Sequence, residues 1–104
     1  MKTSEILRHT RDALRDGGHM MVFERYGCYA LNWLYLRHKI GDRDRTKGKR
    51  VLRKHLDGSQ SLEAWLQKHH GICTTNTVAY KKKIMTTRKA WLTHLIEHYE
   101  SKGD

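Results

Sequence analysis

Proline is absent from this chain of 104 residues, and cysteine occurs only twice. The absence of proline suits a compact helical domain, because proline interrupts helices. The two cysteines, Cys28 and Cys73, lie far apart and form no Cys-x-x-Cys pair. Such sparse cysteine is usual in a reducing compartment, and we expect a cytoplasmic protein.

A long hydrophobic run is also missing. The most apolar stretch, CYALNWLYL from Cys28 to Leu36, is far shorter than the ~20 residues that a helix needs to span a bilayer. No basic-then-apolar leader of the secretory kind is visible at the N-terminus. We expect a single small domain over residues 1–104, without a membrane as partner.

Acidic residues are few, with 11 Asp and Glu against 21 Lys and Arg, and the formal net charge is +10. The cations gather in two segments, which are RHKIGDRDRTKGKRVLRKH at 37–55 (net +7) and KKKIMTTRK at 81–89 (net +5). A solvated face that only favours solubility is one interpretation. Two concentrated patches are more typical of a chain that binds an anionic partner, most often nucleic acid.

Apolar residues recur at helical spacing through much of the chain, which predicts a mainly α, compact fold of four to five helices. We expect Ser4 to cap the first helix. The second helix should cover 28–39, and because it is apolar nearly all round it belongs at the centre of the fold. The segment DRDRTKGK (42–49) has no apolar residue, which predicts an exposed connection before a helix that starts at Lys49.

The second half of the chain predicts two further helices. One should be capped by Ser59 or Ser61 and end at Gly71, and the last should be capped by Thr86 or Thr87. Two short apolar segments are harder to assign, because periodicity does not separate strand from turn at this length. Residues 20–24 and 73–80 could pair as a small two-stranded β ribbon, or form an irregular plug and a turn that leads into a short helix.

Two resemblances arise from the quoted segments. Over nearly the whole chain, the order of elements resembles an uncharacterised family of small phage and actinobacterial proteins, through GCYALNWLYL and VAYKKKIMTTRKAWLTHLIEHY. That family carries Asn-Asp where this chain has Lys81-Lys82 after Tyr80. It brings no function with it, and it would place the protein in a host-cell cytoplasm if the chain is phage-encoded.

The second resemblance is local. SLEAWLQKHHGICTTNTVAYKKKIM (61–85) is similar to a helix-turn-helix. The resemblance implies that Gly71 takes the left-handed turn conformation while Ile72 and Val78 lock the two helices together. The second helix, with Lys81, Lys82 and Lys83, would then lie in the DNA major groove.

Catalytic and metal-binding signatures are weak. HLIEH (94–98) matches the H-x-x-E-H pattern of one zinc-peptidase class, but histidines that flank a Trp/Leu/Ile stripe are usually boundary residues. His69, His70 and Cys73, with or without Cys28, match no familiar zinc-finger spacing. No phosphate loop, nucleophile elbow or carboxylate pair is visible. We therefore expect no enzyme activity, no cofactor and no metal.

The charge pattern gives the functional expectation, which is a protein that binds nucleic acid, DNA rather than RNA, through the two basic patches. The alternative is a protein-interaction module that docks on an acidic host protein and inhibits it. The candidate contacts with nucleic acid are the cations of the two patches, Arg43, Arg45, Lys47, Lys49, Arg50, Arg53, Lys54, Lys81, Lys82, Lys83 and Arg88.

Overall fold

A computed structural model describes residues 1–14, 29–56, 62–71 and 78–104. Within these ranges the backbone forms five helices and no strand, so the mainly α prediction is confirmed. The Cα radius of gyration is 13.1 Å, close to the ~13 Å of a compact domain of 100 residues. The helices are α1 (Thr3–Ala13), α2 (Tyr29–Leu36), α3 (Asp42–Lys54), α4 (Leu62–His70) and α5 (Val78–Ser101).

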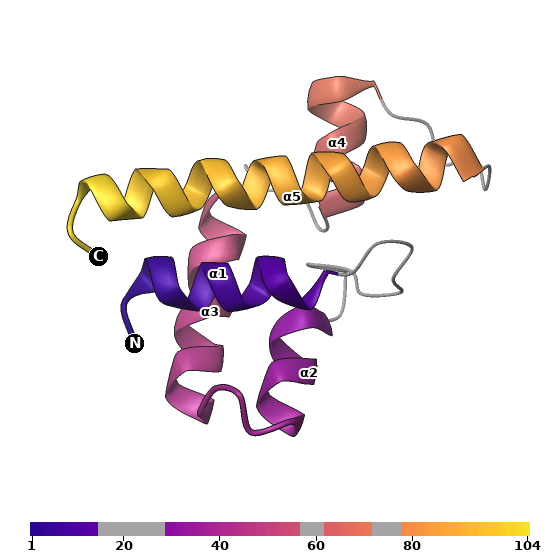
Figure 1. Ribbon diagram of the computed structural model, residues 1–104. Helices are drawn as coiled ribbons and strands as arrows, with labels where there is room; N and C mark the ends of the chain where they lie inside the picture. Colours follow the sequence, from indigo (N-terminus) through magenta and orange to yellow (C-terminus); the bar gives the residue numbers. More distant parts are fainter. Residues whose placement is uncertain (15–28, 57–61, 72–77) are drawn as a thin grey trace.

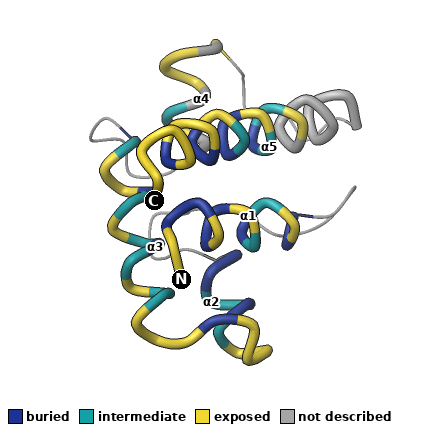
Figure 2. The backbone as a smooth tube through the Cα atoms, turned by 60° about the vertical axis from the view of Figure 1, so that its left-hand side comes forward, coloured by how far each residue is buried: buried dark blue, intermediate teal, exposed yellow. Residues whose placement is uncertain are grey.

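The core lies where α1 packs on the C-terminal half of α5 and on the pair α2 and α3. Figure 1 shows α1 between α5 on one side and α2 and α3 on the other, with α4 beyond α5. The buried positions of α1 and α5 face each other in Figure 2. The apolar side chains that fill this space are Ile6, Leu7, Leu31, Leu34, Leu52, Leu56, Trp91, Leu92, Leu95 and Ile96.

Helix α3 differs from the predicted loop-then-helix arrangement. It begins at Asp42, so the segment expected to be an exposed connection is helical. The first turn contains Asp42 and Asp44 and the last turn contains Arg53 and Lys54. These charges oppose the helix dipole at both ends and stabilise a segment that has few apolar residues.

Gly48 explains how α3 packs without an apolar residue in its first half. This glycine is buried, and a Cβ at its position would lie 2.8 Å from Cδ1 of Leu31 and 3.0 Å from Cγ2 of Ile6. The α3 backbone therefore approaches α1 and α2 more closely than a larger residue permits.

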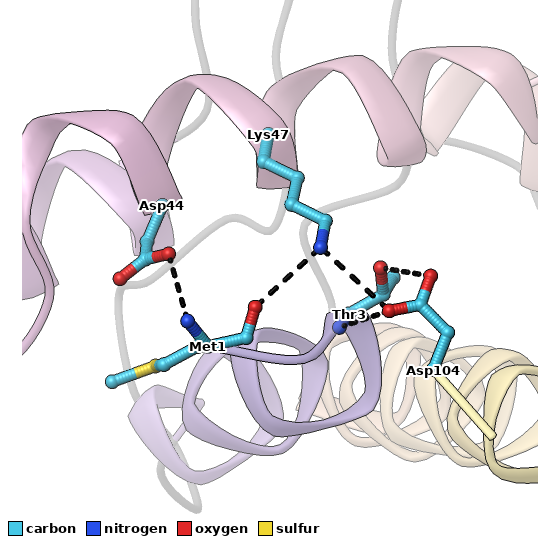
Figure 3. A network of polar contacts seen from close by, with 5 residues as sticks. All are labelled: Met1, Thr3, Asp44, Lys47 and Asp104. Carbon is cyan, nitrogen blue, oxygen red and sulfur yellow. Dashed lines mark hydrogen bonds and ion pairs between the residues drawn. The ribbon is translucent and has the colours of Figure 1, made fainter.

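The start of α1 is capped from the other end of the chain. Ser4, the predicted cap, lies inside the helix and is buried, and the actual N-cap residue Lys2 makes no side-chain cap bond. Instead the backbone amide of Thr3 donates to Oδ1 of Asp104 at 3.1 Å. The backbone amide of Ser4 donates to the backbone oxygen of Asp104 at 3.0 Å. Figure 3 shows this closure, in which Asp104 also accepts from the Thr3 hydroxyl at 2.8 Å.

The possible β ribbon and the predicted start of the last helix both involve α5. Residues 20–24 and 73–77 of the possible ribbon lie outside the described residues. Residues 78–80 belong to α5, so they are not part of a strand and agree with the alternative in which the segment leads into a helix. Thr86 and Thr87 lie inside α5 and cap nothing. Among the described helices, none has both the length and the apolar character needed to cross a membrane.

Candidate nucleic-acid interface

The exposed side of α3 is a row of cations. Successive helix residues rotate by about 100°, so the inward positions 48 and 52 leave 43, 50, 53 and 54 on the outer side. Arg43, Arg50, Arg53 and Lys54 are exposed, and Lys49 is half-buried at the edge of the same side. From Arg43 to Lys54 the row extends ~16 Å along the helix at 1.5 Å per residue. Exposed and intermediate positions follow the outer side of α3 in Figure 2. These five cations are called the α3 basic face below.

The two acidic residues of α3 do not neutralise this face. Asp42 forms an ion pair with Arg45, one turn along the helix. Asp44 lies 3.4 Å from the amino group of Met1. Among the residues that the structure describes, Arg43, Lys49, Arg50 and Lys54 have no ion-pair or hydrogen-bond partner, so their charges remain available to a ligand.

Two predicted contacts are engaged within the molecule instead. The guanidinium of Arg45 pairs with Asp42 and stacks over the Tyr35 ring, 4.0 Å from its centroid. Nζ of Lys47 lies 3.6 Å from Oδ1 of Asp104 and 3.4 Å from the Met1 carbonyl oxygen (Figure 3). The structure therefore separates these two residues from the α3 basic face.

Arg88, another predicted contact with nucleic acid, is not on the surface. Its side chain is buried on the inner side of α5, with only 7% of its surface exposed. Burial lowers the pKa of its guanidinium to about 10, because desolvation disfavours the charged form. In this conformation Arg88 contributes to the interior rather than to a surface that contacts phosphates.

Lys81, Lys82 and Lys83 belong to the first turns of α5, which form one continuous helix with its buried C-terminal half. The first turn of α5 contains no acidic residue. In Figure 1 this end of α5 lies on the far side of the molecule from α3. The structure thus does not join the two predicted patches into one row.

The helix-turn-helix segment agrees in part with its expected geometry. Helix α4 ends at His70, and Gly71 has a φ of +62°, the left-handed conformation that the resemblance implied. Ile72 lies outside the described residues. The Trp65 ring of α4 packs against Trp91 of α5 at a centroid distance of 5.9 Å, so the two helices touch well beyond the expected turn.

Sequence reasoning missed two exposed cations at the end of α2. Arg37 lies over the Trp33 ring at 4.9 Å, and Lys39 is exposed two residues later. Both belong to the first basic segment, whose net charge was the available signal. No further feature of the sequence distinguished them from the seven cations of α3.

The histidines that could suggest a metal lie apart from one another or against aromatic rings. His69 packs on Trp65 at 4.6 Å between centroids, and His98 lies edge-on to His55 at 6.0 Å. Within the described ranges, no three His, Cys, Asp or Glu residues are placed to hold one metal ion. Cys28 and Cys73 lie outside those ranges.

Comparison with models of protein families, with curated proteins and with solved structures gives no match.

Proposed function

We propose that this protein binds duplex nucleic acid, DNA in preference to RNA, through the α3 basic face. The observation that carries the proposal is the exposure of Arg43, Arg50 and Lys54 on one side of a helix whose own acidic residues are paired elsewhere. Lysine and arginine that reach phosphates release condensed counterions, which drives binding to the duplex backbone.

The shape of the site favours DNA over RNA. An exposed helix fits the B-DNA major groove, which is ~12 Å wide, whereas the deep major groove of A-form RNA excludes side chains. Helix α3 itself contains no Phe, Trp or Tyr. Single-stranded nucleic acid is usually held by stacking on such aromatics, so a duplex is the better ligand.

The lysines at the start of α5 supply a second contact in this proposal. Three cations near a helix N-terminus are repelled by the helix dipole, which is positive at that end. An anionic ligand such as a phosphate would relieve this repulsion. We therefore keep Lys81, Lys82 and Lys83 as a second phosphate contact, with site preference as a separate question.

The test is a salt titration of binding to a 20-base-pair DNA duplex by the wild type and by the triple variant Arg43→Gln, Arg50→Gln, Lys54→Gln. Each lost duplex contact should flatten the log–log salt slope by about 0.9, so the variant should lose roughly 2 to 3 units of slope. Binding to the matching RNA duplex should be weaker for both proteins.

The matched control carries three Lys→Gln changes on other elements, at the exposed residues Lys2, Lys68 and Lys102. It lowers the net charge by the same amount and should keep the wild-type slope to within about one unit. Equal salt slopes for the two triple variants would mean that net charge alone sets the slope, and would refute a localised interface. Absence of binding to any duplex at low salt would refute the proposal altogether.

A further inference from the structure

The corner between α2 and α3 exposes apolar surface. Leu36 has 74% of its surface exposed and Met1 has 48%, and these are the large apolar side chains most open to solvent among the described residues. Both line one open depression of about 640 Å³, together with Tyr35 and Ile40. Exposed apolar side chains that share a depression are typical of a surface that another molecule covers.

Basic side chains border this depression. His38 and Lys39 line it and are exposed, and Arg37 precedes them over the Trp33 ring. No acidic side chain lines the depression. The nearest acids on α3, Asp42 and Asp44, are paired with Arg45 and with the Met1 amino group. The depression therefore combines an apolar floor with a cationic rim.

His38 holds the corner in a conformation that favours glycine. Its φ is +57°, and it follows α2 in a Schellman-type ending in which the amide of Lys39 donates to the Leu34 carbonyl at 2.9 Å. Glycine is the usual residue at such a position, because a Cβ is strained there. The chain presents an imidazole to the rim at a conformational cost, and strained residues of this kind gather at ligand-binding sites.

We propose that this corner docks an acidic segment of a partner protein, which inserts an aliphatic side chain between Leu36 and Met1. The rim selects the partner's carboxylates by charge, and the floor removes apolar surface from water on both sides. A nucleic acid would satisfy the cations but would leave the aliphatic floor exposed, so a protein segment fits better. This surface adjoins the α3 basic face at Arg43, two residues after the lining residue Gly41, but consists of other side chains. The inference does not rest on the proposed function.

The probe is a fluorescein-labelled peptide with one leucine between two runs of four glutamates, titrated into the isotopically labelled wild-type protein. We expect saturable shifts of the NMR signals of Leu36, Lys39 and Ile40. The same peptide with serine in place of leucine should bind about tenfold more weakly, because burial of a leucine side chain contributes roughly that factor or more. This second peptide separates docking from attraction to a chain of net charge +10.

Two variants sharpen the test. Leu36→Ser should weaken the leucine peptide about tenfold and leave the serine peptide unchanged. His38→Gly should weaken both peptides, because it removes an imidazole N–H donor for a carboxylate. It should also raise the melting temperature, since glycine relieves the strained φ. The control Arg50→Gln, Lys54→Gln should weaken duplex binding but keep the affinity for the leucine peptide within about twofold of wild type.

Four outcomes would overturn the inference. They are equal affinity for the two peptides, shifts confined to residues 43–54, shifts of Leu36 and Met1 on addition of a DNA duplex, and a dimer in sedimentation that Leu36→Ser abolishes. The third would extend the nucleic-acid interface to the corner, and the fourth would make a second copy of the chain the occupant. Loss of duplex binding by the α3 variants leaves this inference unaffected.

Discussion

Gly48 sets the distance between α3 and the rest of the core. Leu31 and Ile6, whose methyl groups lie nearest to the missing Cβ, are both fully buried. Because protein interiors are close-packed, these side chains would have to shift to admit a Cβ at position 48. The glycine is therefore a packing requirement rather than a break in the helix.

We predict that Gly48→Ala lowers stability, although alanine is the better helix former by about 1 kcal/mol. Overpacking typically costs ~1–3 kcal/mol, which exceeds that gain on average. The net loss should appear as a fall of several degrees in melting temperature for a domain of this size. Thr46→Ala is the control, because Thr46 is exposed on the same helix. A higher melting temperature for Gly48→Ala would contradict the packing described above.

The burial of single cations was beyond prediction from the sequence. Arg88 and Lys89 are adjacent in one basic run, yet Arg88 is buried and Lys89 is half-exposed. Their separation depends on which side of α5 meets the core, and Arg88 lies in register with Leu92 and Leu95. A net charge counted over the segment does not contain that information.

At the scale of elements, the sequence predicted α4, the central α2 and the C-terminal part of α5, but it placed the start of the third helix at Lys49 instead of Asp42. The failure has a definite cause: the inward side of α3 passes through Gly48 before it reaches Leu52 and Leu56. A glycine that serves as a buried contact looks like a loop residue in a pattern of apolar spacing. The acidic first turn and basic last turn were the remaining signal for a helix.

Helix α5 raises the question of whether its first turns read a base sequence. If the helix-turn-helix resemblance holds, Lys81→Gln, Lys82→Gln, Lys83→Gln should weaken DNA binding and also abolish preference for a selected site, because base edges would be read from that helix. The measurement is competition binding of a sequence selected from a random pool against its scrambled form. Equal losses for both sequences would make these lysines a phosphate clamp and exclude the helix-turn-helix interpretation.

At the scale of the whole molecule, three helices meet where the two described ends of the chain come together. Asp104, after α5, binds Thr3 of α1 and lies 3.6 Å from Lys47 of α3. Further along α1, Arg8 pairs with Glu100 of α5. A contact between residues more than a hundred positions apart leaves no periodic trace, which explains why the sequence pointed to Ser4 as the cap instead.

This closure makes stability depend on pH. The pKa of the Asp104 carboxylate lies below the usual value. The main cause is the hydrogen bonds from the amide and then the hydroxyl of Thr3, and Lys47 contributes less. A depressed pKa in the folded state adds stability above the ordinary aspartate pKa of ~3.9, and this stability is lost as the pH falls through the folded value.

We therefore predict that Asp104→Asn lowers the free energy of unfolding at pH 7, and that the difference from wild type shrinks as the pH falls below about 4. Urea denaturation at a series of pH values measures this difference. Glu97→Gln is the control, since Glu97 is exposed on α5 and has no partner among the described residues, so its curve should follow the wild type. If the Asp104→Asn curve instead ran parallel to the wild-type curve down to pH 2, the Asp104 carboxylate would not be the group that couples the closure of the three helices to pH.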